Sequence, residues 1–428
     1  MHTTKSSEKI TPFGGLNFCL EIYRDSGLAE LVDNHLGPRV QTRGFSYSDI
    51  LANQLTIFFA GGDCAEDINE HLRGPASNIK GLSVCSADTL LRGVKELASD
   101  SQKLNHPTSG VEHTFNINTP LNDLMIKALR LTGQLSEGTG YDLDYDNQVI
   151  ATEKWDAVRT YKKCHGYQPG IASIDSMPVY IEGRNGNSQA TFAQADTLQR
   201  MFDRLGDNQI RIKRFRADSG SYIKKAVEVV EANTDYFYIR ARRSADMLEQ
   251  IGELGEHDWK AVRLESQRMD VAELSWTPFG GTRSYRLIVS RIKRKDNQGD
   301  LFSKSAYTYR GILTNDDKRS PKQIVAFYNK RGSSERVFDV MNNDFSWSKL
   351  PCSFLCENTA FMILTAMCAN FYRYIITLYS KSIPWLKPSF RLKKFIFRFI
   401  TVPAKWVNSS RKDILKLYTS KDYHLLKE

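Results

Sequence analysis

Three aspartates separated by single residues lie in the segment from Gly140 to Asp146, which reads Gly-Tyr-Asp-Leu-Asp-Tyr-Asp. The alternation of Asp with Tyr or Leu predicts a β-strand, because side chains of a strand alternate between its two faces. Asp142, Asp144 and Asp146 then share one face. Carboxylates two strand steps apart, roughly 7 Å, repel one another unless a cation or a protonation shift relieves them. A divalent metal ion is the usual relief, so the segment predicts a metal site.

A second acid, Asp218, follows the predicted strand 210–217 and precedes Ser219 and Gly220. An Asp at the end of a strand is a common site position in α/β proteins, because the backbone is rigid on one side and open on the other. The structural alternative is an Asx turn between Asp218 and Gly220.

A third acid, Glu335, lies in a predicted helix that begins at Pro321, the position that Pro prefers. Tyr328, Arg331 and Glu335 are spaced to lie on one face of that helix. Gly332 weakens the helix by about 1 kcal/mol relative to Ala, which close backbone approach would explain. The structural alternative is a solvated, charged helix face.

The elements that must position these acids form four predicted regions. Residues 1–135 are predicted to be an N-terminal helical, DNA-binding domain, and residues 136–242 and 318–380 an α/β catalytic domain. Residues 243–317 contain short alternating runs and Gly280-Gly281, which predict a β-rich insertion. Residues 381–428 form a basic C-terminal segment.

The charge distribution indicates an anionic partner. The 428 residues carry a formal net charge of +10. Residues 381–428 contain twelve Lys or Arg against three Asp or Glu, a surplus of nine that leaves +1 for the rest of the chain. Lysines and arginines there alternate with aromatic residues, which suits phosphate contact on one side and apolar packing on the other. An interfacial amphipathic helix is the alternative, but Pro403 ends the segment early.

A short helix is predicted after Ser86, which is a favourable N-cap. It presents Thr89, Arg92 and Lys95 on one side. The functional interpretation is the second helix of a helix-turn-helix that enters a DNA groove. The structural alternative is an ordinary amphipathic helix.

Several classes of protein lack support. Seven cysteines without a CxxC pair indicate neither a disulfide framework nor a zinc site, so reduced cytosolic thiols are expected. No GxGxxG or P-loop pattern occurs, so no nucleotide cofactor is expected. The apolar stretch 354–378 is interrupted by Glu357, Asn358, Asn370 and Arg373, which favours a buried helix over a membrane span.

The order of the three acids resembles DDE-type insertion-sequence transposases over most of the chain. An acid on a first strand is followed by an acid at the end of a later strand and by an acid on a late helix after a β-rich insertion. The specific match is the signature Tyr328-x2-Arg331-x3-Glu335, with Asn342 where related sequences usually have Lys. Asp218 resembles the second aspartate of the family. Asp144 fits the first best, with Asp142 as the alternative.

The resemblance implies a ribonuclease-H-like mixed sheet flanked by helices, interrupted by the insertion. The implied activity is metal-dependent DNA cleavage and strand transfer, with two Mg²⁺ ions, replaceable by Mn²⁺, held by Asp144, Asp218 and Glu335. The implied partners are double-stranded DNA, namely terminal inverted repeats and target DNA, and a second copy of the chain. The implied setting is the bacterial cytoplasm near the nucleoid, without a membrane.

The resemblance also implies DNA contacts from several segments. In hairpin-forming relatives a Trp of the insertion stacks on an extruded base, and Trp276 and Trp259 are the candidates here, with a core position as the alternative. The full set of predicted DNA-contacting residues is Tyr328, Arg331, Trp276, Arg92, Lys95, Arg391, Lys393 and Lys394.

Two rival functions remain. A DNA-binding protein derived from a transposase could have lost cleavage. An Asp-x-Asp phosphohydrolase is a further alternative, but its motif needs an apolar strand before it, and residues 133–140 do not form one.

Overall fold

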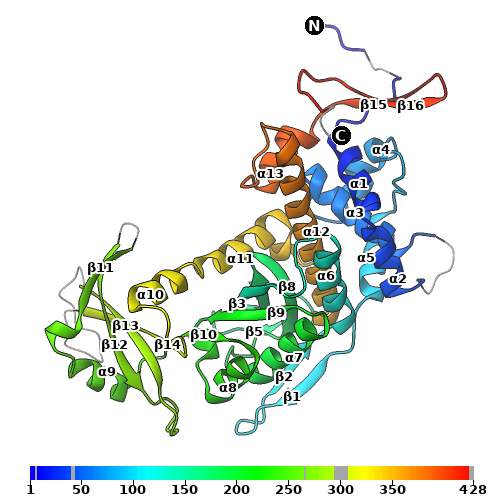
Figure 1. The fold of residues 1–428 in the computed structure, drawn as a ribbon. Helices are drawn as coiled ribbons and strands as arrows, with labels where there is room; N and C mark the ends of the chain where they lie inside the picture. The colour runs from blue at the N-terminus through cyan, green and yellow to red at the C-terminus, as the bar shows by residue number, and fades with distance from the viewer. Residues whose placement is uncertain (5–6, 40–43, 265–266, 294–306, 424–428) are drawn as a thin grey trace.

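The computed structural model describes residues 1–428, with the exception of residues 5–6, 40–43, 265–266, 294–306 and 424–428. The side chains of Ser333 and Ser334 are also outside the description. Figure 1 shows N-terminal helices beside a central mixed sheet, with a β-rich extension at the far side and the C-terminal segment returning to the N-terminal helices.

Five strands at the centre of the sheet have the order β8-β7-β3-β9-β10. Strands β8, β7 and β3 are antiparallel neighbours, and β9 and β10 continue the sheet in parallel from β3. This is the ribonuclease-H-like sheet that the resemblance implied. The strands are β3 (Gly140–Asn147), β7 (Gly170–Ile174), β8 (Met177–Arg184), β9 (Arg211–Ala217) and β10 (Tyr236–Arg240).

Strand β3 has the predicted alternation of faces. Leu143 and Tyr145 are buried in one core cluster, with Tyr141 packed against it. That cluster contains apolar side chains of α7 (Gln194–Asp207) and α8 (Lys224–Asn233), which therefore cover this face of the sheet. The aspartates lie on the other face, where α11 (Gly332–Asp344) packs against β3.

Helix α12 (Leu355–Ser382) packs against β8 and α6 (Thr119–Leu131). Within the described part of the chain it is the one helix long and apolar enough to cross a membrane, but 72% of its most apolar window is buried inside the protein. The predicted buried helix is therefore confirmed.

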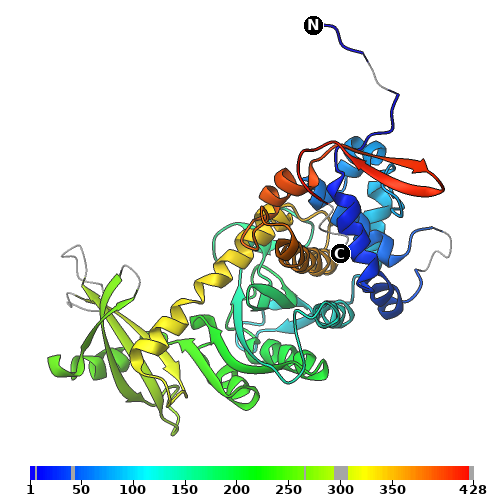
Figure 2. The same cartoon turned by 45° about the horizontal axis from the view of Figure 1, so that its top comes forward.

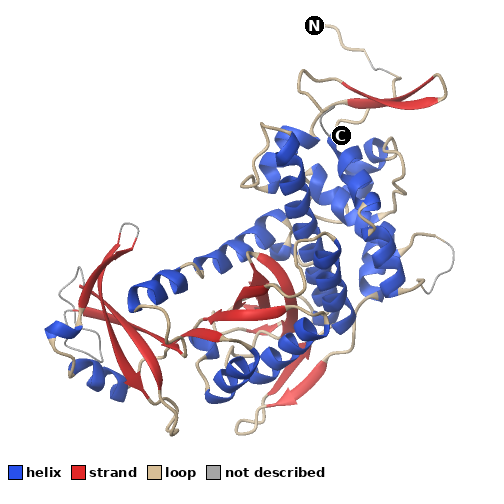
Figure 3. Ribbon diagram, in the orientation of Figure 1, coloured by secondary structure: helices blue, strands red, loops and turns tan. Residues whose placement is uncertain are grey.

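The insertion is β-rich, as predicted. It contains α9 (Ala245–Gly252) and the strands β11 (Lys260–Leu264), β12 (Gln267–Trp276), β13 (Tyr285–Lys293) and β14 (Tyr307–Thr314). Neighbouring strands are antiparallel. Because β14 also pairs with β10, the insertion extends the central sheet. Figure 3 shows this run of strands, followed by the two helices α10 (Pro321–Asn329) and α11 that return to the core.

The N-terminal region is not helical throughout, which corrects the prediction for residues 1–135. Strand β2 (Glu112–Asn116) pairs with β8, and β1 (Gln102–Asn105) pairs with β2. These two strands form by pairing onto the edge of the sheet at β8, and the local sequence of residues 102–116 does not indicate that pairing. The N-terminal helices are α1 (Gly15–Asp25), α2 (Leu28–Leu36), α3 (Tyr47–Ala60), α4 (Arg73–Ala76) and α5 (Ala87–Glu96), with a π-helical turn η1 (Ile68–Leu72).

The C-terminal segment packs on the N-terminal helices (Figure 2). The ring centroids of Phe399 and Phe18 are 6.1 Å apart, and those of Phe395 and Phe59 are 6.4 Å apart. The C-terminal segment therefore has the predicted apolar side. Its aromatic residues pack with those of the N-terminal helices in one hydrophobic core. The segment contains α13 (Leu392–Phe395), η5 (Ile396–Ile400), β15 (Ala404–Ser409) and β16 (Lys412–Leu417).

Candidate active site

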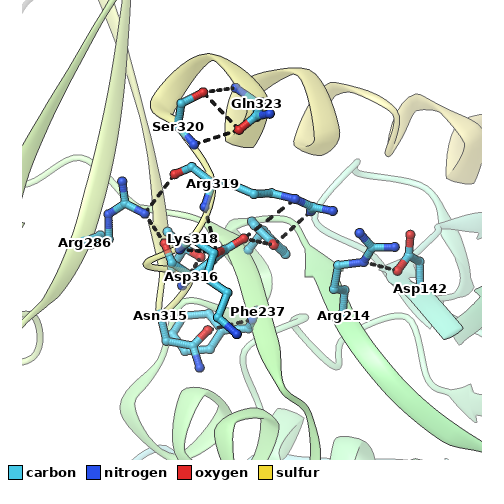
Figure 4. Close-up of polar contacts among 12 residues, drawn as sticks. Asp142, Arg214, Phe237, Arg286, Asn315, Asp316, Lys318, Arg319, Ser320 and Gln323 are labelled. Atoms are coloured by element: carbon cyan, nitrogen blue, oxygen red, sulfur yellow. Dashed lines mark hydrogen bonds and ion pairs between the residues drawn. The ribbon is translucent and has the colours of Figure 1, made fainter. Parts of the chain in front are cut away.

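Arginines on β9 neutralise two of the three aspartates on β3. The parallel register places Asp142 opposite Arg214 and Asp144 opposite Arg216. Arg214 donates to Asp142 (Figure 4). Arg216 binds Asp144 through two hydrogen bonds, Nε to Oδ1 at 2.7 Å and Nη2 to Oδ2 at 2.8 Å. The sequence suggested that a metal ion would offset the repulsion between these aspartates. At these two positions, guanidinium groups offset it instead.

The next position along both strands brings two carboxylates together. The last register pair is Tyr145 with Ala217, so Asp146 and Asp218 follow as neighbours on the same face. Asp218 accepts a hydrogen bond from the Gly220 backbone N–H at 2.8 Å, so the Asx turn is present. This bond uses Oδ1 and leaves Oδ2 for another partner. Like charges side by side are unfavourable without a cation.

Arg331 is the cation that approaches this pair. Its Nη2 lies 2.8 Å from Asp146 Oδ2, and its side chain is 15% exposed. Burial lowers the pKa of the Arg331 guanidinium, but nearby groups outweigh burial and raise the pKa above its ordinary value. Those groups are Asp146, Tyr328, Asp218 and Asp144. The guanidinium group of Arg331 therefore interacts with acids of both strands, Asp146 on β3 and Asp218 after β9.

Tyr328 has an internal position. Its ring is buried, and its hydroxyl donates to the Ala217 carbonyl oxygen at 3.1 Å. Because Ala217 precedes Asp218, this bond attaches α10 to the strand end that carries the acid. The predicted DNA contact by Tyr328 does not fit this position, since the hydroxyl and the ring are both used inside the protein.

Glu335 lies in the first turn of α11 and is exposed. The single helix predicted from Pro321 is two helices, because α10 ends at Asn329 and α11 begins at Gly332. Gly332 has no described atom within 4 Å of an added Cβ, so close backbone approach does not explain this glycine. Glu335 lies four residues, about one helical turn, after Arg331, whose side chain contacts Asp146.

The insertion tryptophans are core residues, which corrects the prediction of base stacking by Trp276. Trp276 is 7% exposed, and its indole N–H donates to the Tyr222 hydroxyl at 2.9 Å. Trp259 is 9% exposed and lies under the Arg291 guanidinium at 4.3 Å. Neither ring is open to a nucleobase.

The predicted DNA-contacting cations of the two ends differ in their surroundings. Arg92 and Lys95 are exposed on α5, and Ser86 caps this helix by accepting from Thr89 N–H at 3.2 Å, as predicted. Lys393 and Lys394 are also exposed. Arg391, in contrast, pairs with the carboxylates of Asp339 and Asp344 on α11.

Among the described residues, the carboxyl groups of Asp146, Asp218 and Glu335 do not form a preassembled metal cluster, but their donor type suits a divalent cation. Carboxylate oxygens are the hard donors that Mg²⁺ and Mn²⁺ prefer. Asp146 and Asp218 present theirs from adjacent strand ends, and the side chain that approaches them is itself cationic. The residues that sequence reasoning undervalued are Asp146, Arg214 and Arg216. A pattern in the sequence could have indicated this pairing. Charged residues recur at every second position in both strand segments, at 142, 144 and 146 and at 214, 216 and 218.

A ribonuclease-H-like sheet with acids near the ends of its two central parallel strands and on a following helix is the arrangement expected of a polynucleotidyl transferase. The chain matches the model of the family described as transposase DDE domain group 1 over residues 2–426. It belongs to this family, and it is a DNA transposase.

A solved structure that the chain matches is the piggyBac transposase synaptic complex with hairpin DNA. It is 12% identical to this chain, with a TM-score of 0.43, and the match covers 91% of this chain and 80% of that one. No curated protein matches the chain. Family membership confirms the expected cut-and-paste transposition, DNA binding and use of a divalent metal, and it removes the phosphohydrolase alternative.

Proposed function

We propose that this transposase cuts DNA at the terminal inverted repeats of its mobile element and joins the ends to target DNA. It acts as a homodimer on paired ends, in the cytoplasm of a bacterium at the nucleoid. Two Mg²⁺ ions, replaceable by Mn²⁺, are its cofactors. The observation that supports the site is the neighbouring position of Asp146 and Asp218 beyond the last register pair of β3 and β9.

Asp146, Asp218 and Glu335 are the proposed metal ligands. This differs from the sequence-based choice of Asp144, with Asp142 as alternative. Both carboxyl oxygens of Asp144 are bound by Arg216, and Asp142 is paired with Arg214, in both cases by an arginine of the neighbouring strand. Asp146 is also ion-paired, but its partner Arg331 comes from the break between α10 and α11. Asp146 lies closer to the second strand's acid. We assign Asp144 a positioning role, in which it holds Arg216 and, through Arg216, the Phe327 carbonyl of α10 at 2.8 Å.

The divalent ions supply activation of the attacking hydroxyl and stabilisation of the leaving oxygen. The chain's own residues hold the DNA for that reaction. Arg331 is ion-paired with Asp146; once Asp146 serves as a metal ligand, the guanidinium group becomes able to contact a phosphate oxygen beside the scissile bond. The Tyr328 hydroxyl keeps the end of β9, and therefore Asp218, in place.

Nicking of DNA that carries the element's ends tests the proposal. Asp146→Asn and Asp218→Asn are expected to abolish Mg²⁺-dependent nicking while DNA binding persists. Asp144→Asn is expected to retain nicking at a reduced rate, because the amide keeps one acceptor for Arg216. Loss of nicking in Asp144→Asn with full nicking in Asp146→Asn would favour the sequence-based choice. The absence of nicking by the unaltered chain would favour a DNA-binding protein that no longer cuts.

A further inference from the structure

A pocket lies beside the acids, on the side of α10. It has a volume of about 530 Å³. Its walls come from β3, β9, the turn between β7 and β8, the segment that enters α10, and α12. Asp144 and Arg216 line it, so the pocket and the candidate active site share a wall.

Cations predominate in this pocket. Five of its lining residues are basic and three are acidic. The basic residues are Arg214, Arg216, Arg319, Lys330 and Arg373. Two acids, Asp142 and Asp144, are already neutralised by Arg214 and Arg216. Arg319 is 3.9 Å from the Asp316 carboxylate outside the pocket. Lys330 and Arg373 then stand against the one remaining acid, Asp175, so the pocket keeps a positive surplus.

One aromatic ring orders three of the guanidinium groups. Arg214, Arg216 and Arg319 have their Cζ atoms 4.8, 4.5 and 4.7 Å from the centroid of the Phe327 ring. Stacking on a ring fixes a guanidinium group in place. Arg216 already donates from Nε, Nη1 and Nη2 to Asp144 and to the Phe327 carbonyl. Arg214 and Arg319 are therefore the stacked groups that can offer N–H donors to an anion. Arg319 is further fixed by a 3.1 Å hydrogen bond to the Tyr238 hydroxyl (Figure 4).

Two cations of the pocket, Arg373 and Lys330, are exposed. Lys330 lies at the break between α10 and α11, directly before Arg331. Among the described residues no carboxylate forms an ion pair with it. A strand of DNA that places one phosphate at Arg331 therefore has Lys330 and the pocket next along its path.

We propose that this pocket holds a backbone phosphate of the DNA strand that enters the active site. The inference rests on the proposed function, because it takes the acids as the place of cleavage. A phosphate fits because its oxygens accept from several guanidinium and ammonium donors at once, and because a rigid, pre-ordered arginine cluster loses little freedom on binding it.

The salt dependence of DNA affinity in the absence of Mg²⁺ tests this pocket. Lys330→Gln should weaken binding and make the slope of log affinity against log salt shallower by about 0.9, the change for one lost phosphate contact. Lys322→Gln is the matched control, since Lys322 is an exposed lysine of the same helix α10 outside the pocket. Arg373→Gln should behave as Lys330→Gln does. An unchanged slope in both pocket variants would overturn the proposal.

Single methylphosphonates, which remove the charge of one phosphate, identify the contact. At one position near the cleavage site the substitution should weaken binding by the unaltered chain and have no further effect on Lys330→Gln. If no position behaves in this way, the pocket does not hold a backbone phosphate of the bound DNA, and the proposal is wrong. DNA binding is measured without metal, so the binding result can be interpreted even if the protein does not nick DNA.

Discussion

Arg216 binds both carboxyl oxygens of Asp144 across two parallel strands, at 2.7 and 2.8 Å, with both side chains almost fully buried. The same guanidinium donates to the Phe327 carbonyl of α10 at 2.8 Å. One side chain thus connects the two central strands of the sheet with the helix that leads to Glu335.

Arg216→Ala should destabilise the protein strongly. Removing one partner of a buried ion pair leaves the other charge unpaired, at a cost of about 3–5 kcal/mol. Urea unfolding followed by circular dichroism measures the loss. The double variant Asp144→Asn/Arg216→Gln is the control and should recover much of the stability, because no buried charge remains. Equal losses in both variants would show that the pair is not coupled.

Tyr328→Phe should lower the nicking rate and reduce stability by about 1 kcal/mol, the net value of one hydrogen bond. The lost bond is the one from the Tyr328 hydroxyl to the Ala217 carbonyl, which keeps the strand end before Asp218 in place. Tyr161→Phe, at a 65% exposed tyrosine, is the comparison. A normal nicking rate in Tyr328→Phe would mean that this bond does not position Asp218.

Asp316→Asn should destabilise the junction between the insertion and α10. The buried Asp316 carboxylate accepts from the Tyr238 hydroxyl at 2.5 Å and from the backbone N–H groups of Lys318 and Arg319 (Figure 4). Burial raises the pKa of Asp316, but these hydrogen bonds outweigh burial and hold it below its ordinary value. Hydrogen bonds to a charged group contribute about 1.5–3 kcal/mol each at most.

The pH dependence of this contribution has a defined sign. Because the folded pKa is depressed, the stabilisation is complete above the unfolded pKa of about 3.9 and is lost as the pH falls toward the folded pKa. The difference in unfolding free energy between the unaltered chain and Asp316→Asn should therefore be constant from pH 7 to 5 and shrink below pH 4. If this difference in unfolding free energy grew as the pH fell, the Asp316 carboxylate would not have a lowered pKa in the folded protein.

Trp276→Phe should reduce stability without changing the way the protein binds DNA. The substitution removes the indole hydrogen bond to Tyr222 and part of a buried ring. Fluorescence of 2-aminopurine placed at the element's end reports base stacking, and its quenching should be the same for both proteins. Quenching that disappears in Trp276→Phe would restore the base-stacking role.

The sequence predicts much of this architecture because its strongest patterns are local. The alternation in residues 140–146 gives β3 and its two faces, and the β-rich insertion and the buried helix α12 follow from composition and periodicity. The partner of each aspartate could not be predicted in the same way, because strand register depends on pairing between distant segments. Strand β2 was missed for the same reason, since its partner β8 lies more than sixty positions further along the chain.

Affinity cleavage tests the central claim most directly. Fe²⁺ bound in place of Mg²⁺ generates radicals that cut the polypeptide near the ion. The account predicts cuts beside Asp146, Asp218 and Glu335, which disappear in Asp218→Asn and in excess Mg²⁺. Cuts confined to other segments, or cuts unaffected by Asp218→Asn, would contradict a metal site between the two strand ends and α11.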